Sequence, residues 1–313
     1  MLNGSGMTYF KSLVAATLTT LAVGCVTQDG PSGLSQTIPT SDQVAINLPG
    51  GQDRSVGQLS DYYVTTRLVT STLNGGSAWV LVLLHTIVET PPTTVNGNVY
   101  TWGPGSSALD PATYQLQVTA NADGTFDYVL SGQPKDNLAA GYISLITGHA
   151  VPATSGDPGT GNFDINFDGI HGVDPIDNPN AAGDVQVGYD LGAGHLELAL
   201  SNVMFNGQPE TATYEYDTTA NGGGDMTFDI HAQLDGTDAI EEVTMRSRWL
   251  GDGAGRGDAR ITGGELGSNE ALASECWNTM FIETYYTDNV NFQPTQGDPS
   301  TCVFTDQDLP PPT

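Results

Sequence analysis

Basic residues are scarce in this chain, and half of them fall in one short stretch. The sequence holds 36 Asp and Glu but only 8 Lys and Arg, four of which are Arg246, Arg248, Arg256 and Arg260. The even spacing within each pair places both members on one face of a strand. Guanidinium groups bind carboxylate or phosphate in bidentate fashion, which would make an anion site. Alternatively, the four form an ion-pair network.

The ion-pair network is favoured because the preceding strands are expected to carry acidic polar faces. Like charges placed directly across neighbouring strands are unfavourable, and an adjacent row of arginines would relieve them. The residues expected on those polar faces are Glu215, Asp217, Asp225, Asp229 and His231.

A second pattern is typical of calcium ligation. Asp164, Asn166 and Asp168, followed by Gly169, offer oxygens at alternate positions, as the opening of a calcium-binding loop does. The twelfth position of such a loop is Glu, whereas this chain has Pro175. The residues between the three are apolar, as in a half-buried strand. We therefore expect a strand and keep calcium as the alternative; no other cofactor is indicated.

Recognisable catalytic motifs are missing from the sequence. It contains no Gly-x-Ser-x-Gly, no His-Glu-x-x-His, no phosphate-binding loop and no Cys-x-x-Cys. The five His residues are scattered without metal-ligand spacing. Carboxylates are so abundant that no pair is singled out for hydrolysis. We expect a non-catalytic protein, and a hydrolase acting on envelope polymers is the least favoured alternative.

The N-terminus has the plan of a secretory signal peptide. An apolar run from Leu13 to Val23 follows Lys11, and it is about half as long as a helix that spans a bilayer. The residues Leu21-Ala22-Val23-Gly24-Cys25 resemble the lipobox of bacterial lipoproteins. This resemblance implies cleavage before Cys25, a lipid on Cys25 that anchors the chain in a membrane, and, with Val26 next, sorting to the outer membrane.

Two further cysteines, Cys276 and Cys302, follow Cys25. An even pair in an exported chain predicts one disulfide. The surrounding strings, such as Ser247-Arg248-Trp249-Leu250 and Glu275-Cys276-Trp277, resemble uncharacterised envelope lipoproteins of deltaproteobacteria. The resemblance implies a recurring domain and no particular activity.

The secondary structure is expected to change from helix to strand near Thr94. Apolar spacing predicts a helix over 60–73 that stops at 74–76, and a second helix over 78–88. Beyond Thr94 the period is two, with turn residues between about eleven strands. The fold class is α+β, mostly β: a large curled antiparallel meander, as a half-barrel or barrel, with the helical segment on its apolar face. A β-sandwich is the alternative.

The domain organisation follows from composition. We expect a signal peptide over 1–24, a lipidated flexible tether over 25–49, a single β-rich domain over 50–304 and a disordered tail over 305–313. The net charge of −28 argues against nucleic acid as a partner, because phosphate contacts need clustered basic residues.

A binding or structural module of the cell envelope, with an unknown envelope partner, is the favoured function. The alternative is a half-barrel carrier of a lipophilic ligand, and fold analogy alone supports it. The residues expected to line such a cavity are Tyr114, Leu116, Phe126, Tyr128, Phe228 and Ile230.

Overall fold

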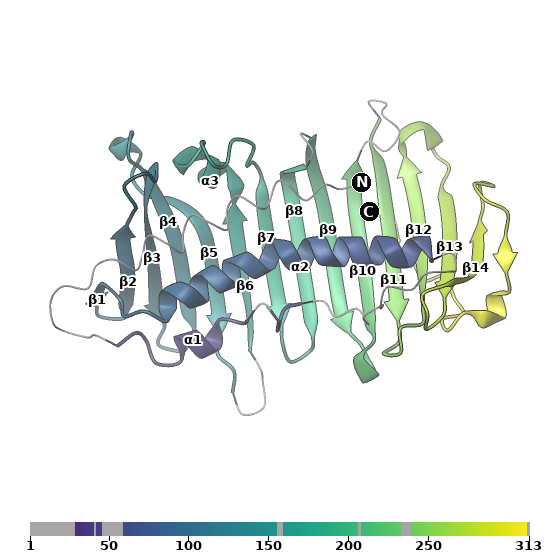
Figure 1. The fold of residues 1–313 in the computed structure, drawn as a ribbon, viewed down its shortest axis with the longest axis horizontal. Helices are drawn as coiled ribbons and strands as arrows, with labels where there is room; N and C mark the ends of the chain where they lie inside the picture. The colour runs from purple at the N-terminus through teal and green to yellow at the C-terminus, as the bar shows by residue number, and fades with distance from the viewer. Residues whose placement is uncertain are drawn as a thin grey trace. The chain divides into compact units, whose positions relative to one another are not determined.

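The computed structural model describes residues 29–40, 42–45, 59–154, 159–205, 208–232 and 239–311. The predicted signal peptide and Cys25 lie outside these residues. Within them, fifteen strands pair in sequence order from β1 to β15, each antiparallel to the next (Figure 1). The sheet is curled and not closed. The predicted α+β fold, a mostly β antiparallel meander, is therefore confirmed, and it is open.

The elements have the following bounds. The α-helices are α1 Leu34–Thr37, α2 Asp61–Val88 and α3 Phe167–Val173. The strands are β1 Thr94–Asn96, β2 Val99–Gly105, β3 Ala112–Ala120, β4 Phe126–Pro134, β5 Ile143–Val151, β6 Thr160–Asn166, β7 Asp184–Asp190, β8 His195–Phe205, β9 Gln208–Thr218, β10 Gly224–Ala232, β11 Glu241–Trp249, β12 Gly255–Gly263, β13 Ala271–Trp277, β14 Glu283–Asp288 and β15 Gln296–Gly297.

Contacts divide the chain into two compact units. The first contains Asn74–Gly192 and the second contains Glu210–Thr313, with short segments added to each. Helix α2 contributes to both, because Ile46–Leu73 belongs to the second unit. The two units are described separately below.

Helix α2 is continuous, whereas the sequence predicted a break at 74–76. Each of the two glycines there costs roughly 1 kcal/mol relative to alanine in a helix interior. Both flanking segments are packed: Thr66 on one side and Val80 and Leu81 on the other have no exposed surface. Burial of these segments outweighs the local preference of the glycines, so the helix does not stop.

The first unit has one apolar sheet face. Leu116, Leu130, Ile146, Ile165 and Val185 lie directly opposite one another across β3 to β7, and they form one row on that face. All five are buried. Burying such a row contributes roughly 1.5–3 kcal/mol per side chain, which makes this row a main source of the unit's stability.

The second half of α2 covers this apolar face. Trp102 lies opposite Leu116 in the sheet, and its indole Nε1 donates to the Thr90 carbonyl, just beyond the end of the helix, at 2.7 Å. Leu81 and Leu84 of the helix are fully buried. The predicted packing of a helical segment on the apolar face is confirmed.

The second unit packs the first half of α2 against its own strands. The Thr66 and Ser247 hydroxyls lie 2.6 Å apart. The Tyr62 ring lies over Gly257, where an added Cβ would come within 2.6 Å of ring carbon Cδ2. Residues next to Ser247 on β11 and next to Gly257 on β12 therefore point to the opposite face.

Part of the predicted tether is also described. Leu34 of α1, Ile38 and Val44 are buried, so these residues pack within the first unit. The composition predicts a flexible segment here, because large apolar residues are sparse over 26–49. The three that lie among the described residues of this range are buried, which composition does not reveal.

Candidate functional site

The face of the second unit opposite α2 carries the four arginines predicted to cluster. Arg246 and Arg248 come from β11, and Arg256 and Arg260 come from β12. We call this surface the arginine face. It also includes the polar side chains that contact the arginines, which are Asp225, Thr244, Asp258 and Ser274.

Asp258 lies at the centre of the arginine face. Its side chain has no exposed surface, and it accepts hydrogen bonds from Arg256 Nε at 2.8 and 3.0 Å. It also accepts from Arg248 Nη2 at 3.2 Å and from the Ser274 hydroxyl at 2.6 Å. Arg248 and Arg256 are directly opposite in the ladder, so one carboxylate separates two like charges that would otherwise repel.

Arg246 has its own carboxylate. Its Nε and Nη2 donate to the two oxygens of Asp225 at 2.9 and 2.7 Å, a bidentate pair across β10 and β11. These hydrogen bonds raise the pKa of Arg246 above its ordinary value. The structure thus places Arg246, Arg248 and Arg256 in ion pairs with carboxylates of the chain itself, as the network interpretation predicted for them. Arg260 instead donates to the Thr244 hydroxyl at 3.5 Å.

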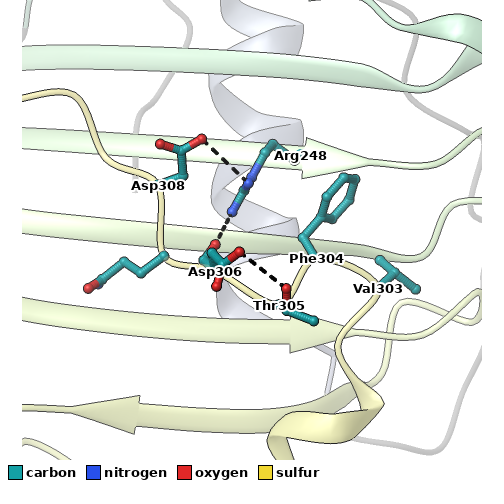
Figure 2. Close-up of a pocket in the computed structure, with 7 residues that line it drawn as sticks. Arg248, Val303, Phe304, Thr305, Asp306 and Asp308 are labelled. Carbon is teal, nitrogen blue, oxygen red and sulfur yellow. Dashed lines mark hydrogen bonds and ion pairs between the residues drawn. The ribbon is translucent and has the colours of Figure 1, made fainter.

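The C-terminal residues complete this arrangement. Residues 303–310, here called the C-terminal strap, cross the arginine face (Figure 2), with α2 behind the strands. Arg248 Nη2 donates to the Asp306 carbonyl at 2.5 Å, and Arg246 Nη1 donates to the Asp308 carbonyl at 2.9 Å. The Phe304 ring lies 5.0 Å from the Arg248 guanidinium carbon. This differs from the disordered tail expected from 305 onwards.

A disulfide fixes the start of the strap. Cys276 of β13 and Cys302 are bonded, with a Cα–Cα distance of 5.5 Å. Both residues are buried. The covalent bond therefore holds Val303 beside the arginine face.

Glu275, next to this cysteine, points to the helix face. Its two oxygens accept from the backbone N–H groups of Asp61 at 3.0 Å and Tyr62 at 3.3 Å, at the start of α2. Burial raises its pKa to about 7, and the carboxylates of Glu283 and Asp61 add to this. Glu275 thus supplies acceptors for two N–H groups of the first turn of α2, and the Ser60 hydroxyl accepts from the Tyr63 N–H at 3.0 Å.

The residues proposed for calcium do not form a loop. Asp164 and Asn166 belong to β6, whereas Asp168 belongs to α3. Asn166 Oδ1 accepts from the Gly169 N–H at 2.6 Å and caps α3, and Asp168 accepts from the Gly183 N–H at 3.3 Å. The predicted strand ends at Asn166, because this cap begins a helix there.

One group that the sequence analysis missed has metal-ligand character. Ligand atoms of His195, Glu215 and Asp217 all lie within 4.8 Å of one another, and His195 Nδ1 is 2.8 Å from Asp217 Oδ1. These side chains are exposed or partly exposed. The sequence indicated only that Glu215 and Asp217 share one face of a strand. His195 lies on the neighbouring strand, so its position beside them depends on how the two strands pair.

The residues expected to line a ligand cavity differ in burial. Tyr114, Leu116, Phe126 and Tyr128 are buried in the first unit, and Phe228 and Ile230 of the second unit are half-buried. The hollows found on the described surface include one lined by Arg248 and the strap (Figure 2) and one lined by Thr262 and residues 267–270.

Comparisons with protein-family models, curated proteins and solved structures found no match. Among the described residues, no helix has the length and apolar character needed to cross a membrane.

Proposed function

We propose that this chain is an exported lipoprotein, anchored to the outer membrane through a lipid on Cys25, which serves as a non-catalytic binding or structural module of the cell envelope. The Cys276–Cys302 disulfide is the observation that carries this proposal. Disulfides form and persist in oxidising compartments and are rare in the cytosol. The sequence around Cys25 supports export and lipidation, and the disulfide is consistent with export.

The binding or structural role is supported by the pairing of the charged side chains in the second unit. Arg246, Arg248 and Arg256 are hydrogen-bonded to Asp225, Asp258 and the strap. Charges that are buried and paired in this way hold strands and strap in one arrangement.

The test of anchoring uses the full chain expressed in a Gram-negative bacterium fed a clickable palmitate analogue. The expected result is label on the wild-type chain in the outer-membrane fraction, and no label on Cys25→Ala, which should be released to the periplasm. Wild-type chain that carries no label and remains in the cytoplasm with reduced thiols would refute the proposal.

Native mass spectrometry of the Cys25→Ala chain, purified from the periplasm, separates a module from a carrier. The proposed module gives the mass of the polypeptide alone. A co-purifying lipid of defined mass, in stoichiometric amount, would instead support the carrier of a lipophilic ligand.

A further inference from the structure

The strap presents alternate main-chain carbonyls to the arginine face. The carbonyls of Phe304, Asp306, Asp308 and Pro310 accept from Arg256, Arg248, Arg246 and Arg260 respectively. Arg256 Nη1 also donates to the Thr305 carbonyl at 3.2 Å. A repeat of two residues is that of an extended chain. The four guanidinium groups are thus spaced to bind an extended backbone.

Few strap side chains take part in this binding. Those of Thr305 and Asp306 are exposed, while Gln307 Nε2 donates to the Ser274 hydroxyl at 3.3 Å. The two side chains that contact arginines are Phe304, over Arg248, and Asp308. Recognition therefore depends mainly on backbone geometry, one aromatic ring and one carboxylate.

The carboxylates of the arginine face do not balance all of its arginine charges, and the Asp308 carboxylate of the strap can pair with what remains. Arg246 is paired with Asp225, whereas Arg248 and Arg256 share Asp258. Among these three arginines, one guanidinium charge is left over. Asp308 lies 2.7 Å from Arg246 Nη1 and 3.8 Å from Arg248 Nη1, and it balances that charge.

We infer that the arginine face is a recognition site for an extended acidic peptide segment, and that the C-terminal strap is its resident occupant. A partner segment with an aromatic residue, a carboxylate four residues later and a proline two residues beyond that fits the same groups. The inference rests on the proposed function, since it names a partner class for the binding module. The strap is held at high effective concentration by its own chain, so such a partner must compete with it.

The experiment uses the full chain, folded in a periplasm, with a specific protease sequence inserted between Cys302 and Val303. Cleavage after folding makes the strap a separate peptide that dissociates on dilution. The probe is a fluorescent peptide with the sequence of residues 303–313, and binding is measured by anisotropy. We expect saturable binding, and about two- to fivefold weaker binding for the Asp308→Asn probe, because the ion pairs that are lost are partly exposed. A scrambled probe should not bind.

Two chain variants serve as the matched pair. Arg248→Gln removes the guanidinium that contacts Phe304, Asp306 and Asp308, and should also weaken binding about tenfold. Arg67→Gln, exposed on α2, should leave binding unchanged. The inference is overturned if the native and scrambled probes bind equally, or if neither binds a cleaved chain that keeps its disulfide and near-ultraviolet circular dichroism. Either failure leaves lipid anchoring, measured in cells, unaffected.

Discussion

The Asp258 carboxylate lies 2.8 Å from Arg256 Nε, two residues earlier on the same strand, and the two side chains expose 0% and 6% of their surface. Taking both charges out of water is costly unless each has close partners of opposite charge. Asp258 has two such partners in Arg256 and Arg248, and the neutral Ser274 hydroxyl also donates to it. The stability of the second unit should therefore depend strongly on this one carboxylate.

Asp258→Asn keeps the shape of the side chain and removes its charge. Arg248 and Arg256 then face each other without a shared counterion, and we expect a loss of roughly 3–5 kcal/mol in the free energy of unfolding. Urea unfolding followed by tryptophan fluorescence measures it. The control is Glu270→Gln, an exposed carboxylate of the same unit, which should change stability by less than about 0.5 kcal/mol. Equal effects of the two substitutions would contradict the role given to Asp258.

The raised pKa of Glu275 predicts that the stability of the fold changes with pH in one direction. Its pKa is raised by burial from the ordinary 4.5 to about 7 in the folded chain. Between these values the folded chain holds a proton that the unfolded chain has released, so stability falls as pH rises through this window and then levels off. The ionised carboxylate must then remain in its buried site beside Asp61 and Glu283.

The difference between wild type and Glu275→Gln isolates this contribution. We expect the stability of the wild type relative to the variant to fall from about pH 5 to about pH 7 and to stay constant above about pH 8. Urea titrations across this range measure the difference. A difference that is flat, or that rises with pH, would show that the helix N–H groups outweigh burial at this site.

The disulfide predicts a large effect of its removal. Cys276 and Cys302 are separated by 26 positions, and closing a loop of this length stabilises the fold by roughly 3–4 kcal/mol in the chain-entropy estimate. The double variant Cys276→Ala with Cys302→Ala should lose about that much in urea unfolding. Cys25→Ala is the matched control, because it removes a cysteine without removing the bond. A double variant as stable as that control would contradict the estimate.

The meander could be predicted because its signals are local. Asn121, Asp123 and Gly124 form the turn between β3 and β4, and Gly124 has a φ of 90° that favours glycine. Strand β13 gave no such signal, since its last four residues, 274–277, are all buried and do not alternate. Both of its faces are covered, one by the start of α2 and one by the C-terminal strap, which composition alone does not show.

The candidate site was predicted in part. The clustering of the arginines could be predicted because the two members of each pair are an even number of residues apart on one strand, so their side chains lie on the same face. The strap could not be predicted, since its acidic and proline-rich residues have no apolar pattern, and its partners lie far away in the chain, as with Arg260 and the Pro310 carbonyl. Local composition indicates disorder when the ordering contacts come from distant residues.

Asn166 caps α3, because its Oδ1 accepts from the Gly169 N–H. Asn166→Ala leaves the Gly169 N–H without its acceptor and should cost about 1 kcal/mol in urea unfolding. Asn162→Ala, an exposed asparagine on the same strand, is the control and should cost less than about 0.5 kcal/mol. Because the oxygens of Asn166 and Asp168 accept from separate backbone N–H groups, millimolar calcium should leave the melting temperature of the wild type unchanged. A calcium-dependent rise in the wild type that Asn166→Ala abolishes would instead establish the loop of alternate oxygens as a calcium site.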